Sequence, residues 1–421
     1  MPQNSTLDAD LKLREQFWRD GYLILHDIVP PDRLESLRKT VDDLVVRRRA
    51  KDPDWDTCAA PRSDLTHLVE AGSLGPVELA LHDNTLGISA RLLGDSPESV
   101  SLTAVSIFCN PAFEPVTAPT SGQSWGTDPR NWHRDVRPDQ DGPLSALLAA
   151  EDANGSGYVQ WNIALYDDAI LYVIPGSHRR LTSEVEVLQL QSEGGTQSQL
   201  SGSVCAELKP GSGVVYNSML LHWGSKYTRS KKRRTLQLGV RSFGRFLPHQ
   251  RQCRLRQGVL DVFSADSPQR AALERSFALF RDEFAVFEDA FRAVLGRDQE
   301  HFRAGLQRLH PGSAGHLSSV VILTKIALEL CDRHQREDDF PSGLEGEDYD
   351  NQLYRQLCSR FTEAECEQLR CRFNALDVLL RSGEPVHVSG FLGPPTDYLF
   401  EEIPAELTTE SAIGVIFSEN G

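Results

Sequence analysis

Short apolar runs of strand length dominate the middle of the chain, from about residue 101 to residue 243. Gly, Pro, Asn and Asp separate these runs, as expected of turns between strands. Many short strands with turns between them are typical of a β-sandwich or barrel and not of a sheet built from βαβ units. The sequence therefore predicts a mainly β core, with strands at 102–108, 159–165, 170–174, 213–216 and 235–240.

Helical patterns flank this β region on both sides. On the N-terminal side we expect a helix at 11–19, a strand at 22–25 and a helix that begins at Pro31. On the C-terminal side Ser267 is expected to cap a helix in which phenylalanines recur at helical spacing until Gly296. Two more helices are expected at 317–331 and 363–381, the second with a capping box of Thr362 and Glu365.

These patterns divide the chain into two predicted parts. Residues 1–247 hold the β core and the N-terminal helices, and residues 248–421 form a mainly helical extension. A stripe of phenylalanines on one helix usually packs in a core or at an interface between subunits. We therefore expect the extension to pack on the β core or to form a homodimer through its helices.

The charge balance argues against polyanionic partners. Lys and Arg total 44 against 60 Asp and Glu, a formal net charge of −16 at pH 7. This excess repels phosphate backbones and anionic membrane surfaces, so neither nucleic acid nor a membrane is an expected partner. The first 20 residues intersperse charged side chains, and no stretch reaches about 18 uninterrupted apolar residues, which favours a cytoplasmic protein. The eight cysteines include no CxxC pair, which argues against a disulfide scaffold and a structural zinc site.

Three side chains have the chemistry of metal ligands. His133 and Asp135 stand two positions apart, so on a strand both would point to the same face and could reach one ion. His222 offers a third donor at the end of an apolar run. Two histidines and one carboxylate on one face of an octahedron leave three positions open, as in Fe(II) oxygenases.

Four segments, in this order, support a resemblance to a known family. They are residues 17–25, the triplet His133-Arg134-Asp135, the run at 171–178 that ends in Pro-Gly-Ser-His, and His222 with the arginines that follow it. In these segments the chain resembles the phytanoyl-CoA dioxygenase family of iron and 2-oxoglutarate oxygenases. That resemblance implies a double-stranded β-helix, the jelly-roll fold also found in cupins, flanked by helices.

The resemblance also implies roles for individual residues. Fe(II) would be held by His133, Asp135 and His222, with 2-oxoglutarate as cosubstrate and O2 as oxidant. Arg233 lies 233 − 222 = 11 residues after the distal histidine, where the family pairs an arginine with the far carboxylate of 2-oxoglutarate; the adjacent Arg234 is the alternative.

Two more residues are expected to line the cosubstrate pocket, by the same resemblance. Of Trp161 and Asn162, only one can face inward on a strand, and Asn162 is the expected one. Ser225 follows Gly224, the position at which relatives carry a small hydroxyl residue, and is expected to contact the cosubstrate. The short link at 166–168 is expected to form a tight hairpin.

The expected function is therefore an Fe(II)- and 2-oxoglutarate-dependent dioxygenase. It would hydroxylate, desaturate or cyclise a small metabolite, for instance of secondary metabolism, with release of succinate and CO2. Because related halogenases lack the carboxylate ligand, Asp135 favours these outcomes over halogenation. The alternatives are a non-catalytic, cupin-like binding protein and a zinc hydrolase, for which Asp139 and Asp141 are the nearest general bases in sequence.

Overall fold

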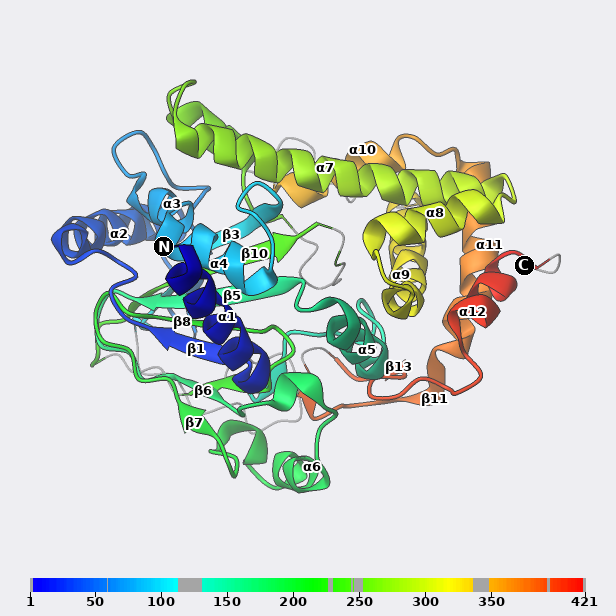
Figure 1. The fold of residues 1–421 in the computed structure, drawn as a ribbon, viewed down its shortest axis with the longest axis horizontal. Helices are drawn as coiled ribbons and strands as arrows, with labels where there is room; N and C mark the ends of the chain where they lie inside the picture. Colours follow the sequence, from blue (N-terminus) through cyan, green and yellow to red (C-terminus); the bar gives the residue numbers. More distant parts are fainter. Residues whose placement is uncertain are drawn as a thin grey trace.

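The computed structural model describes residues 3–58, 60–112, 131–225, 230–243, 245, 253–335, 348–391 and 394–418. Strands gather in one half of the molecule and helices α8 to α12 in the other, while the long helix α7 runs along both (Figure 1). The expected boundary between residues 247 and 248 lies outside the described residues, so the division into two domains stays a prediction.

The larger sheet has six antiparallel strands in the order β1-β8-β5-β10-β3-β2. Their bounds are β1 Tyr22–Leu25, β2 Arg62–Asp64, β3 Val100–Cys109, β5 Tyr158–Ala164, β8 Gly213–Tyr216 and β10 Arg234–Ser242. β3, β5 and β10 are the long strands of this sheet. Every residue of β5 and β10 is buried, because both faces of the sheet are covered.

The smaller sheet has the order β12-β4-β9-β6-β7. Its strands are β4 His133–Arg134, β6 Leu171–Val173, β7 Val204–Cys205, β9 His222–Gly224 and β12 Gly390–Phe391. From β3 to β6, and again from β8 to β10, consecutive strands alternate between the two sheets. Side chains from both sheets, including Val214 of β8 and Val173 of β6, form a shared apolar cluster, so the sheets face each other.

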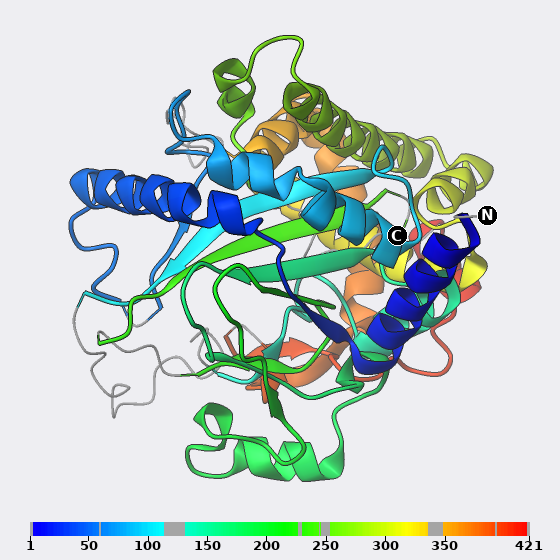
Figure 2. The ribbon, with the colours of Figure 1, turned by 60° about the vertical axis from the view of Figure 1, so that its left-hand side comes forward.

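N-terminal helices cover the outer face of the larger sheet, as Figure 2 shows in blue and cyan. They are α1 Gln3–Asp20, α2 Pro31–Lys51, α3 Gly75–Ala80 and α4 Ile88–Leu93. Trp161 points toward this layer, where its indole Nε1 donates to Ser89 Oγ of α4 at 2.9 Å. The opposite side chain on the strand, Asn162, consequently faces the space between the sheets.

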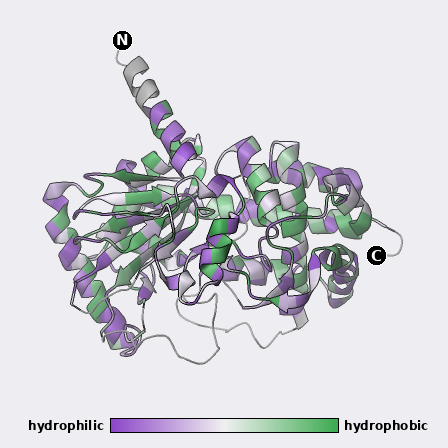
Figure 3. Ribbon diagram, turned by 90° about the horizontal axis from the view of Figure 1, so that it is seen from below, coloured by the Kyte–Doolittle hydropathy of each residue, from purple (hydrophilic) through white to green (hydrophobic). Residues whose placement is uncertain are grey.

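The C-terminal helices form a second layered unit whose apolar core is continuous with that of the β half. They are α7 Pro268–Leu295, α8 Gln299–Leu309, α9 His316–Gln335, α10 Tyr349–Cys358, α11 Glu363–Leu379 and α12 Thr409–Ile416. Hydrophilic and hydrophobic residues alternate around the peripheral helices in Figure 3, as expected when one face of each helix packs inward. Two helices between strands, α5 Leu144–Asn154 and α6 Glu184–Gln191, complete the set of α-helices in the described residues. There are also short helices of other types: the π-helix η1 Asp83–Gly87 and the 3-10 helices η2 Ser177–Arg179, η3 Gly195–Gln197, η5 Gln257–Val262 and η6 Ser313–Gly315.

Helix α7 joins the helical half to the larger sheet. Its phenylalanine stripe, from Phe277 to Phe291, is buried in the protein's own core. Ser276 of α7 accepts a hydrogen bond from the backbone N–H of Leu102, and Glu283 forms an ion pair with Arg241 of β10. Both charged residues are buried, with 4% of Arg241 and 1% of Glu283 exposed. A homodimer through these helices stays a prediction.

Most of the expected elements are confirmed, and one expectation is wrong. The link at 166–168 is not a hairpin, because β5 and β6 lie in different sheets. The C-terminal region is mainly helical, as expected, and adds three short strands in the described residues: β11 Arg381–Val386 pairs with β13 Thr396–Tyr398, and β12 joins the smaller sheet beside β4. The capping boxes of Thr362 with Glu365 and the cap at Ser267 are present as expected.

One segment of the described residues, Ser313–His334, is long and apolar enough to cross a membrane by length and composition. Because 72% of its most apolar stretch is buried inside the protein, it has the character of a core helix. The expected absence of a membrane partner and the cytoplasmic location stay predictions. The described cysteines are all free, in agreement with their scattered spacing.

Replacing Glu283 with alanine should destabilise the protein strongly. The substitution leaves the Arg241 guanidinium buried without its carboxylate, which typically costs about 3–5 kcal/mol. Urea unfolding of wild type and Glu283→Ala measures the difference. Glu410→Ala is the matched control, because it removes an Arg–Glu pair with Arg303 at the surface, where such pairs contribute little. Equal effects of the two substitutions would contradict this role of the buried pair.

Candidate functional site

Three potential metal ligands meet between the two sheets. His133 and His222 are directly opposite each other in the antiparallel pair β4–β9, with ring centroids 4.3 Å apart. Asp135 follows β4, and its carboxylate lies 3.5 Å from His133 Nε2 and 3.8 Å from His222 Nε2. All three residues are buried, and their donor atoms lie within 4.8 Å of one another. The structure thus brings together the three residues that the sequence singled out.

Backbone carbonyls fix the orientation of both imidazoles. His133 Nδ1 lies 2.6 Å from the carbonyl oxygen of Asn131, and His222 Nδ1 lies 2.9 Å from that of Leu220. Each Nδ1 therefore carries the hydrogen and donates, which leaves the Nε2 lone pair pointing to the cluster. Burial and the neighbouring His133 ring also lower the pKa of His222 to about 4, so this imidazole is neutral at physiological pH.

These donors fit a divalent transition metal. Ligands at about 2.1 Å in neighbouring positions of an octahedron are about 3 Å apart, a little less than the 3.5 and 3.8 Å between the Asp135 carboxylate and the two Nε2 atoms. The set has two neutral nitrogens and one carboxylate on one side of the centre. Within the described residues no fourth carboxylate, histidine or cysteine joins the cluster, and a facial triad of this kind leaves positions for exogenous ligands.

Arg134, between the two ligands in sequence, holds the smaller sheet together from its other side. Its guanidinium is fully buried and donates to the carbonyl oxygens of Ser177, Met219 and Arg180. Ser177 Oγ in turn accepts from the backbone N–H of Leu221, next to His222. The Pro-Gly-Ser-His turn therefore locks the strand of one histidine to that of the other. Gly176 has φ of 74°, which a glycine adopts without strain.

His178 has a structural position in this turn. Its Nε2 lies 2.9 Å from the carbonyl oxygen of Trp18, and its ring packs edge-on against the Trp18 indole. It lies outside the cluster of potential metal ligands.

A buried carboxyl group supports the turn that precedes His222. The Asn217 amide donates to both oxygens of Glu151, at 2.9 and 3.2 Å, and its own carbonyl oxygen accepts from Met219 N–H. The next residue of the turn, Ser218, accepts the backbone N–H of Asp135 at 2.8 Å. The same turn thus fixes both Asp135 and His222.

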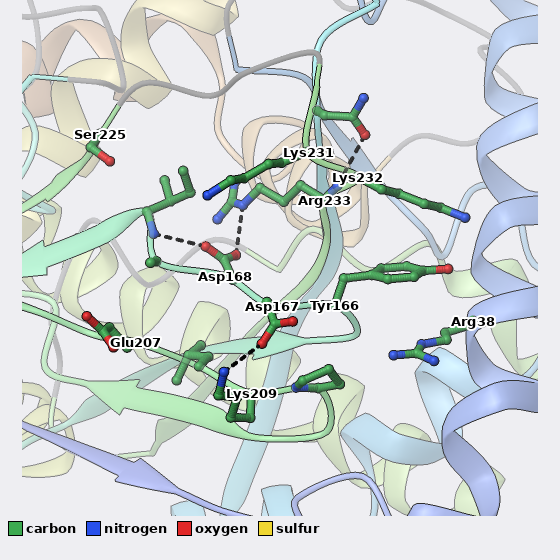
Figure 4. A pocket seen from close by; sticks show the side chains of 15 residues that line it. Arg38, Tyr166, Asp167, Asp168, Glu207, Lys209, Ser225, Lys231, Lys232 and Arg233 are labelled. Atoms are coloured by element: carbon green, nitrogen blue, oxygen red, sulfur yellow. Dashed lines mark hydrogen bonds and ion pairs between the residues drawn. The ribbon is translucent and has the colours of Figure 1, made fainter.

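A second group of residues lines a half-open pocket of about 750 Å³, drawn in Figure 4. Arg233 and Ser225, both named from the sequence, line this pocket, and the three potential metal ligands do not. Asp168 lies beside the guanidinium, accepts from Arg233 Nε at 2.8 Å and is also hydrogen-bonded to Thr235 Oγ1. The Arg233 charge and these hydrogen bonds outweigh burial and keep the pKa of Asp168 below its usual value.

Arg234 points elsewhere. Its Nε donates to Asp42 of α2 at 2.9 Å and its Nη1 to Asn110 at 3.0 Å, on the outer side of the larger sheet. Of the two adjacent arginines, only Arg233 lines the pocket with Ser225. Asn162 faces the space between the sheets, and its buried Oδ1 has no hydrogen-bond partner among the described residues. An acceptor in this state is typical of a position that a ligand or water satisfies.

The two acids named for a hydrolase are engaged locally. Asp141 Oδ2 accepts the backbone N–H of Arg137 at 2.6 Å, and Asp139 forms an ion pair with the Arg137 guanidinium at 3.0 Å. Neither belongs to the cluster of potential ligands.

A comparison with family models matches the chain from residue 17 to residue 236 with the phytanoyl-CoA dioxygenase model. This range covers 220 of the 421 residues and contains the three clustered ligands and Arg233. The chain belongs to the phytanoyl-CoA dioxygenase family.

Individual relatives resemble the chain at low sequence identity. Ectoine dioxygenase of Sphingopyxis alaskensis is 28% identical over 181 residues, which are 41% of this chain and 52% of that protein. The chain thus spans about half the length of this curated relative. Among solved structures, EctD from S. alaskensis with 2-oxoglutarate and 5-hydroxyectoine overlaps with a TM-score of 0.40 and 20% identity, covering 56% of this chain and 77% of that one. AviO1 from Streptomyces viridochromogenes overlaps with a TM-score of 0.38 and 17% identity, covering 55% and 95%.

The sequence reasoning did not single out two residues of this site, Asp168 and Arg134. Asp168, the partner of Arg233, stands in an ordinary Asp-Asp turn, and only the return of the chain through β10 brings the arginine to it. Arg134 had a weak signal, because a strand residue between two inward ligands must point to the opposite face. Its burial there indicates an anchor within the protein and not a solvated charge.

The Glu151 network should make stability depend on pH. Burial raises the pKa of Glu151 to about 7 from an ordinary value of 4.5. Because folding favours the protonated form, its contribution is complete below pH 4.5 and is lost as pH rises through about 7. Relative to Glu151→Gln, which stays neutral, wild type should lose about 3 kcal/mol of unfolding free energy over this range. Urea unfolding at a series of pH values measures it, and parallel pH profiles of the two proteins would contradict the assignment.

Proposed function

We propose that this protein is an Fe(II)- and 2-oxoglutarate-dependent dioxygenase that oxidises a C–H bond of a small metabolite, with release of succinate and CO2. The observation that carries the proposal is the buried cluster of His133, Asp135 and His222, with both imidazole Nε2 atoms aimed at one point. Membership of the phytanoyl-CoA dioxygenase family supports it. We also assign the two facing sheets, with strands that alternate between them, to a double-stranded β-helix.

Each residue of the site has a distinct part in this proposal. His133, Asp135 and His222 would hold the iron, which together with 2-oxoglutarate and O2 supplies the oxidising power. Asp135 occupies the coordination position that a halogenase leaves to chloride, so hydroxylation, desaturation or ring formation is the proposed outcome. The site is buried between two sheets, which limits the access of water to the reacting atoms.

Arg233 would pair with the far carboxylate of 2-oxoglutarate. Asp168 engages the Nε of this guanidinium, so the carboxylate would meet its terminal amino groups, which form the planar fork that suits a carboxylate. Asp168 thereby acts as a positioning residue that fixes the orientation of Arg233. Ser225, on the wall of the same pocket, and Asn162, with its buried amide oxygen, are the further proposed contacts to the cosubstrate.

Anaerobic titration of the Fe(II)-loaded protein with 2-oxoglutarate tests the assignment. Wild type should develop the weak visible charge-transfer band of the iron chelate. His133→Ala should abolish the band, because it removes a ligand. Arg233→Ala should shift the titration to at least tenfold higher 2-oxoglutarate, the loss of about 1.4 kcal/mol or more of charge-assisted pairing.

Arg234→Ala is the matched control, because it removes the adjacent guanidinium from the outer side of the sheet. The proposal would be contradicted if the wild-type protein shows no band, or if Arg233→Ala and Arg234→Ala shift the 2-oxoglutarate titration equally. Release of succinate in air then separates an oxygenase from a cupin-like binding protein, which forms none. The hydrolase would instead be favoured if metal analysis finds zinc in the protein and the Fe(II)-loaded protein shows no charge-transfer band with 2-oxoglutarate.

A further inference from the structure

A second, smaller cavity adjoins the proposed iron site. It is lined by Asp135 and by residues of the larger sheet, and two arginines close it: Arg62 of β2 and Arg254 from the segment after β10. Its volume is about 50 Å³, which is room for a few waters or one small polar group and not for a whole metabolite. It is separate from the pocket of Arg233, with which it shares no lining residue.

The two guanidinium groups have no ionic partner in the described part of the chain. The hydrogen bond printed for the Arg62 side chain is a long one, 3.4 Å to Ser106 Oγ, and its buried Nε has no partner among the described residues. Burial, and then the like charge of Arg254, lower the pKa of Arg62. Asp64 lies behind Ser106, which donates to it, and does not line the cavity. Asp64 and Asp135 act in the opposite direction on this pKa, but neither forms an ion pair with Arg62 in the described residues. Two half-buried cations side by side therefore favour an anion that joins them.

Asp135 cannot serve as that anion once a metal is present. The proposed Fe(II) carries two positive charges, so it more than neutralises the one carboxylate that lines the cavity. Metal binding therefore increases the attraction of the cavity for a negative group. The 2-oxoglutarate carboxylate already has a proposed partner in Arg233. The guanidinium carbons of Arg233 and Arg62 lie 5.3 and 5.7 Å from the centroid of the Phe108 ring.

We infer that the substrate carries a carboxylate, which binds between Arg62 and Arg254 beside the iron site. This inference rests on the proposed function. The floor of the cavity adds neutral donors and acceptors, Tyr158, Gln160 and Gln237, of which Gln237 Oε1 is buried without a partner in the described residues. The lining comes from strands, from Asp135 after β4 and from Arg254 in an irregular segment, and it includes no helix N-terminus, the usual cradle of a phosphate. A planar carboxylate matches two guanidinium forks.

Gly239 sets the shape of this cavity. A Cβ at this position would lie 2.3 Å from the Tyr158 hydroxyl and 2.2 Å from Thr103 Oγ1, so any larger residue would displace the floor of the cavity. Because one small cavity is lined by both arginines and by Asp135, the oxidised carbon should be only a few bonds from the bound carboxylate.

Binding of formate to the loaded protein tests the inference without need of the substrate. The protein is loaded with Mn(II) and saturating 2-oxoglutarate, and the proton relaxation of added formate is measured by NMR. Formate that enters the cavity lies close to the paramagnetic metal, so wild type should show a saturable enhancement of relaxation. Arg62→Gln and Arg254→Gln should each weaken formate binding at least tenfold, while Arg308→Gln, which removes one exposed charge on α8, should leave it unchanged.

The outcomes separate the two proposals. Failure of Mn(II) or 2-oxoglutarate to bind overturns the proposed function itself. If both bind, two results overturn the inference: no formate enhancement in the presence of saturating 2-oxoglutarate, or enhancement that survives in both arginine variants. Tighter competition by inorganic phosphate than by acetate overturns the assignment of the anion as a carboxylate. Arg254→Gln guards against a folding artefact, because the Arg254 side chain forms no hydrogen bond with the described residues that the substitution would remove. Thermal unfolding verifies the fold of this variant.

Turnover gives an independent measure. Carboxylic acids should stimulate succinate release when tested beside their primary amides, with proteinogenic amino acids and short aliphatic and aromatic acids as the panel. An acid that stimulates while its amide does not, and that loses at least tenfold in kcat/KM with Arg62→Gln, supports the inference. A neutral amide that stimulates as well as its acid overturns it.

Discussion

The antiparallel pairing of β4 with β9 is the contact on which the site depends. It consists of one directly opposed pair of residues, His133 and His222, and both are potential metal ligands. Such a short ladder has little stability of its own, because an isolated pair of short strands buries too little surface. The surrounding network supplies the rest: Arg134 joins the two strands through buried carbonyl groups, and Ser177 holds the backbone beside His222. The metal ligands are thus positioned by polar contacts on the outer side of the sheet.

Most of the arginines around this centre are each paired with a carboxylate of their own. Arg233 is paired with Asp168, Arg234 with Asp42, and Arg241 with Glu283, so three arginines of one strand region have each a carboxylate from a different element. Arg62 and Arg254 depart from this pattern, since in the described residues they line one cavity in which the one acid is Asp135, a potential metal ligand. Two half-buried cations that line one cavity beside a metal site favour an anionic ligand.

The local parts of this structure could be predicted from the sequence, and the long-range parts could not. Strand length, turn residues and helix caps are local signals, and β1, β8 and the capping box at Thr362 follow them closely. The His-x-Asp spacing likewise predicted a shared face. The partnership of Arg233 with Asp168 and the meeting of Arg62 with Arg254 have no local signal, because each pair comes from segments that only the folded sheet brings together. The hairpin at 166–168 was wrong for the same reason: a short link does not reveal that the chain changes sheets.

Strand β12 gives the site a dependence on the far end of the chain. Gly390 and Phe391 pair in parallel with His133 and Arg134, so β4 has a neighbour on each side only after the chain has returned from the helical half. Before that return, the strand that carries His133 and leads into Asp135 would be an edge strand with exposed backbone groups. During synthesis the ribosome releases β12 long after β4, β9 and Arg233. The smaller sheet therefore includes strands made early and a strand made late in synthesis. β4 gains its second neighbour only when β12 joins the sheet.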